Sequence, residues 1–360
     1  MTRNLFPGIS ARTVPSSRLR ANVLERGPAA SDRTIVFVHG NVSSSLFWQP
    51  LMLALPDDIH SIAVDLRGFG GSEGLPVDAT RGVRDFADDV WAVIDSIAGG
   101  PGPNAVHLVG WSMGGPIVLQ QLLDRPEQVA SLTLVAPVSP YGLGGTDGVS
   151  GRRVTDDDAG CGGATASAGF VSHLVEGDRT ADHRSSPRTA FRASYVAPGF
   201  RSEYEDIWVE SILSTKVGDR NYPGDSIPSP HWPGFAAGTS GPLNAMAPRY
   251  LDVSGIDRLR CKPPILWARG LQDVIISDSS IFDTNALGLM GRISGWPGSE
   301  IAPPQPMPAQ IRNMLDRYSV AGGTYRELGF ENCGHSPHIE RTAELASALD
   351  AHTAGRVPTG

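Results

Sequence analysis

One short stretch of the chain has the pattern of a nucleophilic serine. Residues 110–114 read Gly-Trp-Ser-Met-Gly, and another glycine follows. The apolar run 105–109 leads into this stretch, and the helix-like run 116–123 follows it. A sharp strand-to-helix turn strains the backbone of the serine, and it requires glycine wherever a Cβ atom would collide with the turn. Ser112 is therefore the candidate nucleophile.

A nucleophilic serine needs a base, and the base needs an acid that orients it. The acid is expected just past a strand, where open α/β sheets bind their ligands. Asp273 directly follows the apolar run 265–268, in the sequence Gly-Leu-Gln-Asp. Asp273 is the candidate acid, with Asp278 and the weaker Asp283 as alternatives.

The candidate base is a histidine near the end of the chain. His335 follows the run 324–330, which reads as a last strand, and it comes directly after Gly334. His338 competes for this role, but it lies nearer to the start of the closing helix. A neutral imidazole at position 335 could accept the serine proton and later pass it to a leaving group.

Hydrolysis through a serine also needs two backbone N–H groups that face the developing negative oxygen. The N–H of Met113 is one candidate, because it stands at the start of the helix that follows the serine. The second is expected after the His-Gly pair at 39–40, which ends another apolar run. We favour Asn41 for this second donor, and Val42 is the alternative.

Taken together, these segments resemble the α/β-hydrolase superfamily. The resemblance rests on His-Gly-Asn at 39–41, Asp-Leu-Arg-Gly-Phe-Gly-Gly-Ser at 65–72, and the segments 110–115, 270–273 and 334–337. It implies a triad in the order serine, acid, histidine. The serine turn is similar to that of esterases, lactonases, carbon–carbon-bond hydrolases and perhydrolases. The His-Gly-Asn loop resembles haloalkane dehalogenases, but these use an aspartate nucleophile where this chain has Ser112.

The elements around these residues predict an α/β fold. Continuous apolar runs at 34–38, 61–64, 106–109 and 132–135 are typical of strands buried on both faces. Between the second and third runs, apolar residues recur at spacings of three and four, which predicts a helix. This alternation predicts a mostly parallel sheet with helices on both faces, and the resemblance implies that this doubly wound sheet has the α/β-hydrolase fold.

Two segments interrupt this pattern. Residues 139–259 are rich in glycine, proline and polar residues, and they are too many for a simple loop. We expect them to form a long, irregular cap or lid, with the core at 1–138 and 260–360. A second lid insertion is expected at about 279–308, between the acid and the base.

Composition excludes several classes of function. The 360 residues carry a net charge of −8, which argues against a nucleic-acid partner. No run is apolar enough to span a membrane, and the first residues lack the apolar core of a secretory signal. The three cysteines are widely spaced and predict reduced thiols, not disulfides or a zinc site. We therefore expect a cytoplasmic protein without a metal site, and the sequence does not predict its oligomeric state.

The expected activity is hydrolysis of a carboxylic ester or lactone, with a small hydrophobic molecule as substrate. The serine would form an acyl-enzyme that water then cleaves, a route that needs no metal or organic cofactor. Two alternatives use the same triad: hydrolysis of a carbon–carbon bond beside a ketone, and acyl transfer. A further alternative is a non-catalytic receptor for a small ligand.

Overall fold

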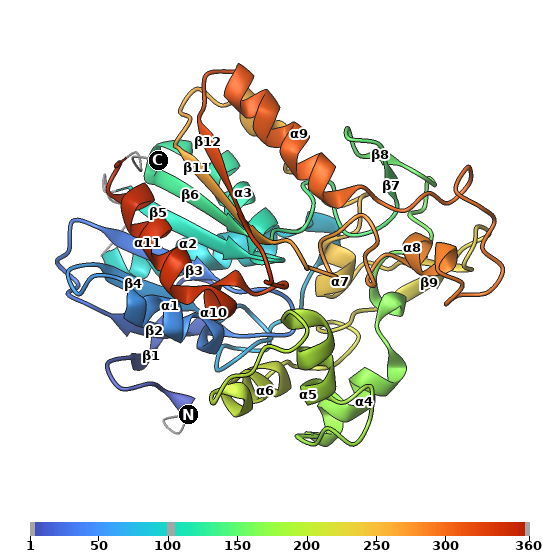
Figure 1. Cartoon of the computed structure of the whole chain (residues 1–360), viewed down its shortest axis with the longest axis horizontal. Coiled ribbons are helices and arrows are strands. Elements are labelled where there is room, and N and C mark those ends of the chain that lie inside the picture. The colour runs from blue at the N-terminus through green and yellow to red at the C-terminus, as the bar shows by residue number, and fades with distance from the viewer. Residues whose placement is uncertain (1–3, 99–104, 357–360) are drawn as a thin grey trace.

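The protein is built around one eight-stranded sheet, seen in a computed structural model that describes residues 4–98 and 105–356 (Figure 1). The strand order is β1-β2-β4-β3-β5-β6-β11-β12. The strands are β1 (Ser10–Pro15), β2 (Arg20–Arg26), β3 (Thr34–Val38), β4 (His60–Val64), β5 (Val106–Trp111), β6 (Val129–Val135), β11 (Ile265–Gly270) and β12 (Tyr325–Phe330). Expectations for residues 1–3, 99–104 and 357–360 lie outside the described part.

The sheet is mostly parallel, as the sequence predicts. β1 pairs antiparallel with β2, and β2 pairs antiparallel with β4, whereas the pairs from β4 to β12 are all parallel. Every residue of β4 and β5 is buried, because helices cover both faces of the sheet. The carboxyl ends of β3, β5, β11 and β12 therefore lie at the same edge, and the loops that follow them can meet.

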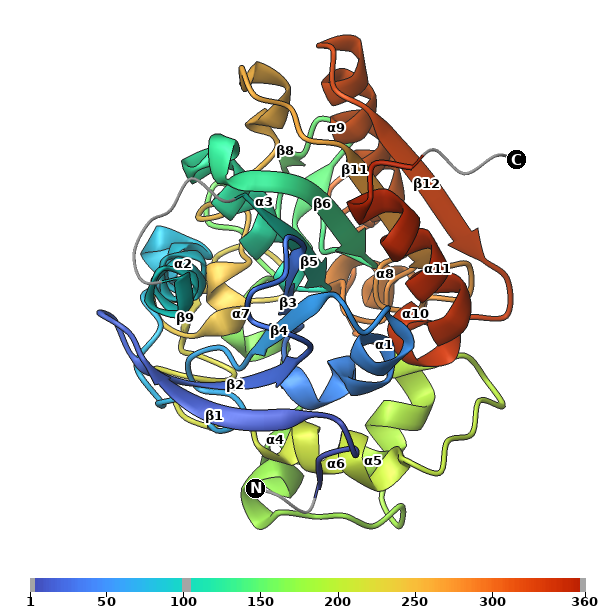
Figure 2. The ribbon, with the colours of Figure 1, turned by 90° about the vertical axis from the view of Figure 1, so that its left-hand side faces the viewer.

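Helices pack on the two faces of the sheet (Figure 2). On one face α2 (Arg84–Ala98) packs against α3 (Gly114–Asp124), and on the other α1 (Gln49–Ala54) packs against α11 (Thr342–Thr353). A further helix, α9 (Met307–Val320), contacts η7 (Gly255–Arg258). Among the described residues, no helix is both long enough and apolar enough to cross a bilayer.

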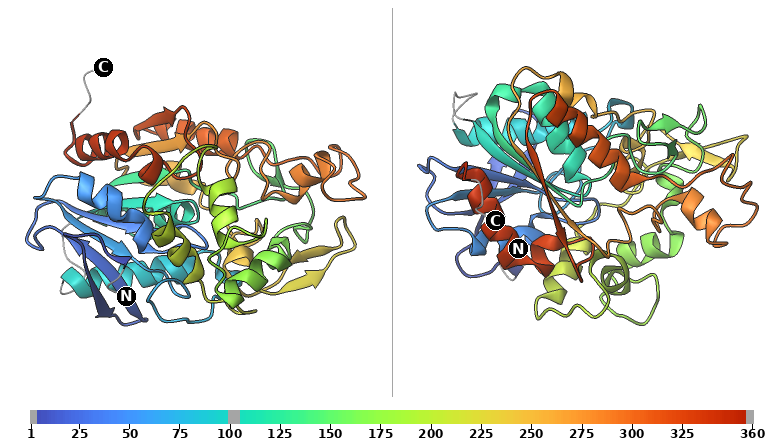
Figure 3. Two further views of the ribbon diagram at one scale, coloured as in Figure 1. Left: turned by 60° about the horizontal axis from the view of Figure 1, so that its bottom comes forward. Right: turned by 45° about the horizontal axis from the view of Figure 1, so that its top comes forward.

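Residues 139–259 contain more regular structure than their composition indicates. Their elements are β7 (Thr146–Asp147), β8 (Arg152–Arg153), η5 (Gly163–Thr165), α4 (Ala168–Glu176), α5 (Pro187–Ala190), the π-helical turn η6 (Phe191–Tyr195), α6 (Glu205–Leu213), β9 (Ser226–Pro228), β10 (Phe235–Ala237), α7 (Pro242–Ala245) and η7. In both views of Figure 3 most of these green and yellow segments lie beside one end of the sheet, whereas η7 packs against α9 and α3. The domain limits at 138 and 260 stay a prediction.

The second insertion packs against the first. It contains α8 (Thr284–Leu289), and the Thr284 hydroxyl donates a hydrogen bond of 2.6 Å to the carbonyl of Gly160. The indole N–H of Trp232 donates to the carbonyl of Ser294 at 2.9 Å. Figure 1 shows α8 and β9 at the end of the molecule farthest from α11.

A buried carboxylate fixes the loop that follows β3. One oxygen of Asp65 accepts the N–H of Ser45 at 2.7 Å, and the other accepts the N–H of Gly71 at 2.8 Å. The Nε2 atom of His39 accepts the N–H of Leu66 at 3.0 Å. The loops after β3 and β4 therefore hold each other in place.

Candidate active site

Ser112 lies at the end of β5 in a strained backbone conformation. Its φ is 55°, in the left-handed region that non-glycine residues rarely adopt. Its N–H donates to Val135 at 3.0 Å, and its carbonyl accepts the N–H groups of Gly115 and Val138 at 2.9 and 3.1 Å. These bonds to β6 and to the following helix hold the turn, and the side chain stays 8% exposed.

The glycines around Ser112 are required by close backbone contacts. A Cβ atom on Gly110 would lie 2.2 Å from the carbonyl oxygen of Gly114, and one on Gly114 would lie 2.3 Å from that of Val38. A Cβ atom on Gly40 would lie 2.8 Å from the Cβ of Ser112. The first two contacts confirm the steric reason for the glycine pattern, and the third places the loop after β3 directly beside the serine.

The candidate acid and base form a buried pair. Nδ1 of His335 lies 2.8 Å from Oδ2 of Asp273, and their side chains are 2% and 3% exposed. The other oxygen of Asp273 accepts the N–H groups of Ile275 and Ile276 at 2.7 and 3.0 Å. An ionised carboxylate only accepts hydrogen bonds, so this pairing places a proton on Nδ1 and leaves Nε2 free to accept one.

The alternative acids have other surroundings. Asp278 is exposed. Asp283 is buried, but it caps α8 by accepting the N–H of Asn285 at 3.0 Å, and it also accepts the N–H of Gln305 at 2.8 Å. Burial raises the pKa of the Asp283 carboxyl. The structure brings Asp273 to His335, and within the described residues neither alternative contacts that ring.

The loop that carries His335 is fixed against β5. The indole N–H of Trp111 donates to the backbone carbonyl of His335 at 2.8 Å, and the two rings lie 5.5 Å apart. Because Trp111 immediately precedes Ser112, this contact places the loop of the base beside the nucleophile. No hydrogen bond joins Ser112 Oγ to His335 within the part of the chain described, and such bonds are often long before substrate binds.

His338, the alternative base, is buried among aromatic rings. Its ring lies 4.5 Å from that of Trp111 and 4.6 Å from that of Trp48. Both ring nitrogens are buried without a hydrogen-bond partner among the described atoms. Burial lowers the pKa of His338 well below its usual range, so the ring stays neutral. Among the residues that the structure describes, it has no carboxylate partner comparable to Asp273.

The candidate oxyanion donors surround the serine turn. Met113 caps the start of α3, and its N–H donates no hydrogen bond to another described residue. The same is true of the N–H groups of Asn41 and Val42. Val42 has a φ of 49°. The N–H groups of all three residues thus lack a hydrogen-bond acceptor among the described residues, and the choice between Asn41 and Val42 stays open.

Two residues that sequence reasoning missed hold this region. Tyr195 lies within residues 139–259 and donates its hydroxyl proton to the carbonyl of Val42 at 3.0 Å. Glu340 accepts the N–H of Gly334 at 2.9 Å and the N–H of Ala197 at 2.7 Å. No local pattern marks either residue, because their partners are distant in sequence.

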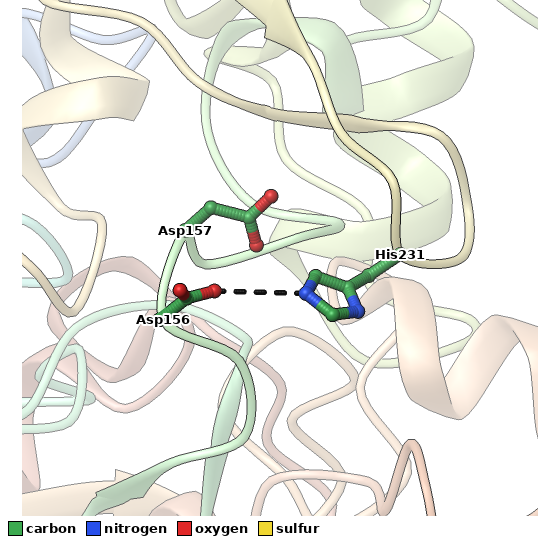
Figure 4. A group of neighbouring side chains, drawn as sticks. All are labelled: Asp156, Asp157 and His231. Atoms are coloured by element: carbon green, nitrogen blue, oxygen red, sulfur yellow. Dashed lines mark ion pairs between the residues drawn. The ribbon is translucent and has the colours of Figure 1, made fainter.

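One group in the described ranges could hold a metal ion. Asp156, Asp157 and His231 each offer a ligand atom, and these atoms lie within 4.8 Å of one another (Figure 4). Nε2 of His231 lies 3.6 Å from a carboxylate oxygen of Asp156. The group lies within residues 139–259, and both residues of this pair are exposed. The cysteines Cys161, Cys261 and Cys333 are free.

Comparison with known proteins agrees with this fold. A family model described as "Alpha/beta hydrolase family" matches residues 35–348. RutD of Variovorax paradoxus, whose name describes a carbamate hydrolase, is 40% identical over 110 residues, 30% of this chain and 39% of that protein. The carboxylesterase YbfK of Bacillus subtilis is 28% identical over 139 residues, 38% of this chain and 45% of that protein. The chain thus spans less than half the length of these curated relatives.

The likeness extends further in three dimensions. The crystal structure of the carboxylesterase CesB (YbfK) from Bacillus subtilis matches with a TM-score of 0.59 and 15% sequence identity. The match covers 99% of this chain and 95% of that structure. At this level of identity the likeness shows the fold alone.

Proposed function

The chain belongs to the alpha/beta hydrolase family, and we propose that it is a serine hydrolase that cleaves a carboxylic ester or lactone. One observation carries the proposal: Asp273 and His335 form a buried pair at 2.8 Å, in the loops beside a serine held at a φ of 55°. This is the arrangement in which a serine hydroxyl becomes a nucleophile.

In the proposed reaction Ser112 Oγ attacks the carbonyl carbon while Nε2 of His335 takes the hydroxyl proton. Asp273 holds the proton on Nδ1 and stabilises the imidazolium that forms. The ester bond then breaks, and His335 passes its proton to the departing alkoxide. A water molecule then attacks the acyl-enzyme while His335 takes its proton, and the proton passes back to Ser112 as the carboxylic acid leaves.

The N–H groups of Met113 and Asn41 are proposed to stabilise the negative oxygen of each tetrahedral intermediate. Their lack of a protein partner supports this role. Met113 also lies at the positive end of α3, which spans Gly114–Asp124 and favours negative charge there. Val42 is the alternative to Asn41 as the second donor.

The proposed substrate is a small ester or lactone with apolar groups. The rings of Trp111 and Tyr195 lie 5.5 and 6.5 Å from the ring of His335, so the surroundings of the base are aromatic. Similarity to a carboxylesterase supports an ester. Apolar surface on a substrate adds binding at about 25 cal/mol per Å² that becomes buried.

A fluorophosphonate probe combined with a substrate panel tests this proposal. The probe reacts only with an activated serine, so it should label the wild-type protein and not Ser112→Ala. Turnover of p-nitrophenyl esters of increasing chain length and of a set of lactones should fall by at least about 10³-fold in Ser112→Ala. Ser279→Ala, which changes an exposed serine, is the matched control and should keep wild-type rates.

Two results would overturn the proposal. One is a Ser112→Ala protein that keeps a tenth of the wild-type turnover. The other is a folded wild-type protein that neither reacts with the probe nor turns over any ester or lactone of the panel. Good turnover of a diketone with poor turnover of esters would replace the proposal with carbon–carbon-bond hydrolysis.

A further inference from the structure

The hydroxyl of Tyr195, from the proposed cap, contacts the loop after β3, which lies beside the nucleophile. Tyr195 ends the π-helical turn η6, and its side chain is 7% exposed. Its Oη atom lies 3.0 Å from the carbonyl oxygen of Val42 and 3.4 Å from that of Asn41. Its ring lies 5.9 Å from that of Trp111. Tyr195 therefore contacts the backbone that carries the second candidate oxyanion donor.

These contacts constrain the direction of N–H groups. In a trans peptide the carbonyl and the N–H point in opposite directions, so a bond to the Asn41 carbonyl constrains the N–H of Val42. The carbonyl of Gly40 shares a peptide with the N–H of Asn41, and it accepts the hydroxyl of Ser43 at 2.8 Å. The Val42 N–H thus belongs to the peptide whose carbonyl Tyr195 contacts, and the Asn41 N–H belongs to the peptide whose carbonyl Ser43 holds.

Val42 needs such support, because its conformation is strained. A φ of 49° is unusual for any residue with a Cβ atom, and in a β-branched residue it marks real strain. Strained backbone persists only where the surroundings hold it. The hydroxyl of Tyr195 holds the carbonyl of this residue, so its loss would let the loop relax.

The segment that presents Tyr195 is itself anchored. The N–H of Ala197 donates to Glu340 at 2.7 Å, and Glu340 also accepts the N–H of Gly334 at 2.9 Å. A Cβ atom on Gly334 would lie 2.6 Å from the nitrogen of Ala197. The cap segment therefore lies directly on the loop that carries His335, and it bridges that loop and the loop after β3.

From these contacts we propose that Tyr195 is a positioning residue for the oxyanion hole: its hydroxyl holds the carbonyls of Val42 and Asn41, and so it fixes the backbone that carries the Val42 N–H and directly follows the Asn41 N–H. This role rests on the proposed serine hydrolase function. With this role for Tyr195, the cap would help to position the oxyanion donors, in addition to any role in covering the active site. Tyr195 acts through the backbone of the loop and not on the substrate.

The test compares two tyrosine-to-phenylalanine variants. Tyr195→Phe removes only the hydroxyl and keeps the ring. Tyr318→Phe is the matched control, because Tyr318 is also fully buried and donates to a backbone carbonyl, that of Pro263, at 2.6 Å. The measurements are kcat and KM for a p-nitrophenyl ester, the inhibition constant of phenylboronic acid, and the melting temperature. Phenylboronic acid bonds to the activated serine and places an oxygen where the oxyanion forms.

We expect Tyr195→Phe to lower kcat by about tenfold with KM within about twofold, since donors that are misdirected lose part of the 10²–10³-fold effect of a donor that is removed. The inhibition constant of phenylboronic acid should rise by the factor by which kcat/KM falls. Tyr318→Phe should keep kcat and inhibition at wild-type values, even where its melting temperature falls.

Three results would overturn this role. The first is a wild-type kcat in Tyr195→Phe. The second is an unchanged boronic acid inhibition constant in that variant. The third is an equal loss of kcat in Tyr318→Phe, which would indicate a general effect of a lost buried hydroxyl. A wild-type protein that does not react at Ser112 would overturn the proposed function as well, whereas a reactive Ser112 with any of these three results overturns only the role of Tyr195.

Discussion

The Nδ1 atom of His335 and the Oδ2 atom of Asp273 lie 2.8 Å apart, although 62 residues separate them in the chain. They meet because β11 and β12 are parallel neighbours whose last residues, Gly270 and Phe330, are paired. The loops that follow the two strands therefore leave the same edge of the sheet side by side. The second insertion fills much of the sequence between them without separating the pair.

The first prediction concerns the acid. Asp273→Asn should lower kcat by about 10⁴-fold with little change in stability, because asparagine keeps the shape but supports the wrong tautomer of the histidine. Asp278→Asn, which changes an exposed carboxylate, is the control and should keep wild-type turnover. Steady-state kinetics on one p-nitrophenyl ester compares the two. If Asp278→Asn is the damaging change, the acid has been assigned to the wrong residue.

The second prediction concerns the base. Activity should fall at acid pH, because a base that is already protonated cannot take the serine proton. The measurement is kcat/KM from pH 5 to 9 on a p-nitrophenyl ester, followed at the isosbestic wavelength of the product. Unfolding curves at each pH separate this effect from loss of the fold. A flat profile, with chemistry limiting the rate, would argue against a histidine base.

The parts of this molecule that were predictable have strong local patterns. All of the parallel strands were predicted. Five of them are largely apolar and buried runs, whereas β12, with only one buried residue, was predicted from its place before the candidate base. β1 was not predicted, because in Ser10–Pro15 only one residue is buried and the run shows no clear alternation. The helix Met307–Val320 was missed as well, because it directly follows a segment rich in glycine and proline.

The same distinction applies to the site. The proposed triad of Ser112, Asp273 and His335 could be named from the sequence because each residue follows a strand whose end can be predicted from the residue pattern. The contact of Tyr195 with Val42 joins residues 153 positions apart, and that of Glu340 with Ala197 joins residues 143 apart. Such contacts depend on how residues 139–259 pack against the loops at the strand ends, and no periodicity or spacing in the chain encodes that packing.

The third prediction concerns the turn that strains the nucleophile. Gly110→Ala should cost about 3 kcal/mol or more of unfolding free energy, because its Cβ atom would lie 2.2 Å from the carbonyl oxygen of Gly114. It should also abolish labelling by the fluorophosphonate probe. Gly148→Ala is the control: its φ is 65° but nothing lies within 4 Å of the added Cβ, so it should cost only about 1–2 kcal/mol. Equal losses in urea unfolding would contradict the steric explanation.

The fourth prediction concerns metal ions. Dialysis against EDTA should leave kcat unchanged, because a Ser-His-Asp mechanism uses no metal. A loss of activity that a divalent cation restores would contradict this expectation. In that case Asp156→Ala should reproduce the loss, because Asp156 belongs to the one group of described side chains that could hold an ion.

The last prediction links pH to stability through a buried histidine away from the proposed triad. His107 lies on β5, and its Nδ1 atom is 2.8 Å from the hydroxyl oxygen of Ser131. Burial, with smaller contributions from the charges of His352 and Arg33, lowers the pKa of His107 to about 4. The unfolded chain takes up this proton near pH 6.5. Between these two values the unfolded state binds more protons, so stability falls as the pH falls.

At about 1.4 kcal/mol for each pKa unit, this one group accounts for a loss of about 3 kcal/mol between pH 7 and pH 4. His107→Gln keeps a hydrogen-bonding group but does not titrate, so urea unfolding should show a smaller loss of stability over that range than in the wild-type protein. The slope should not vanish, because burial also lowers the pKa of His338 and His352. His231→Gln changes an exposed histidine and should leave the wild-type pH dependence intact. Equal pH dependence in His107→Gln and the wild type would show that His107 is not one of the groups through which acid destabilises the fold.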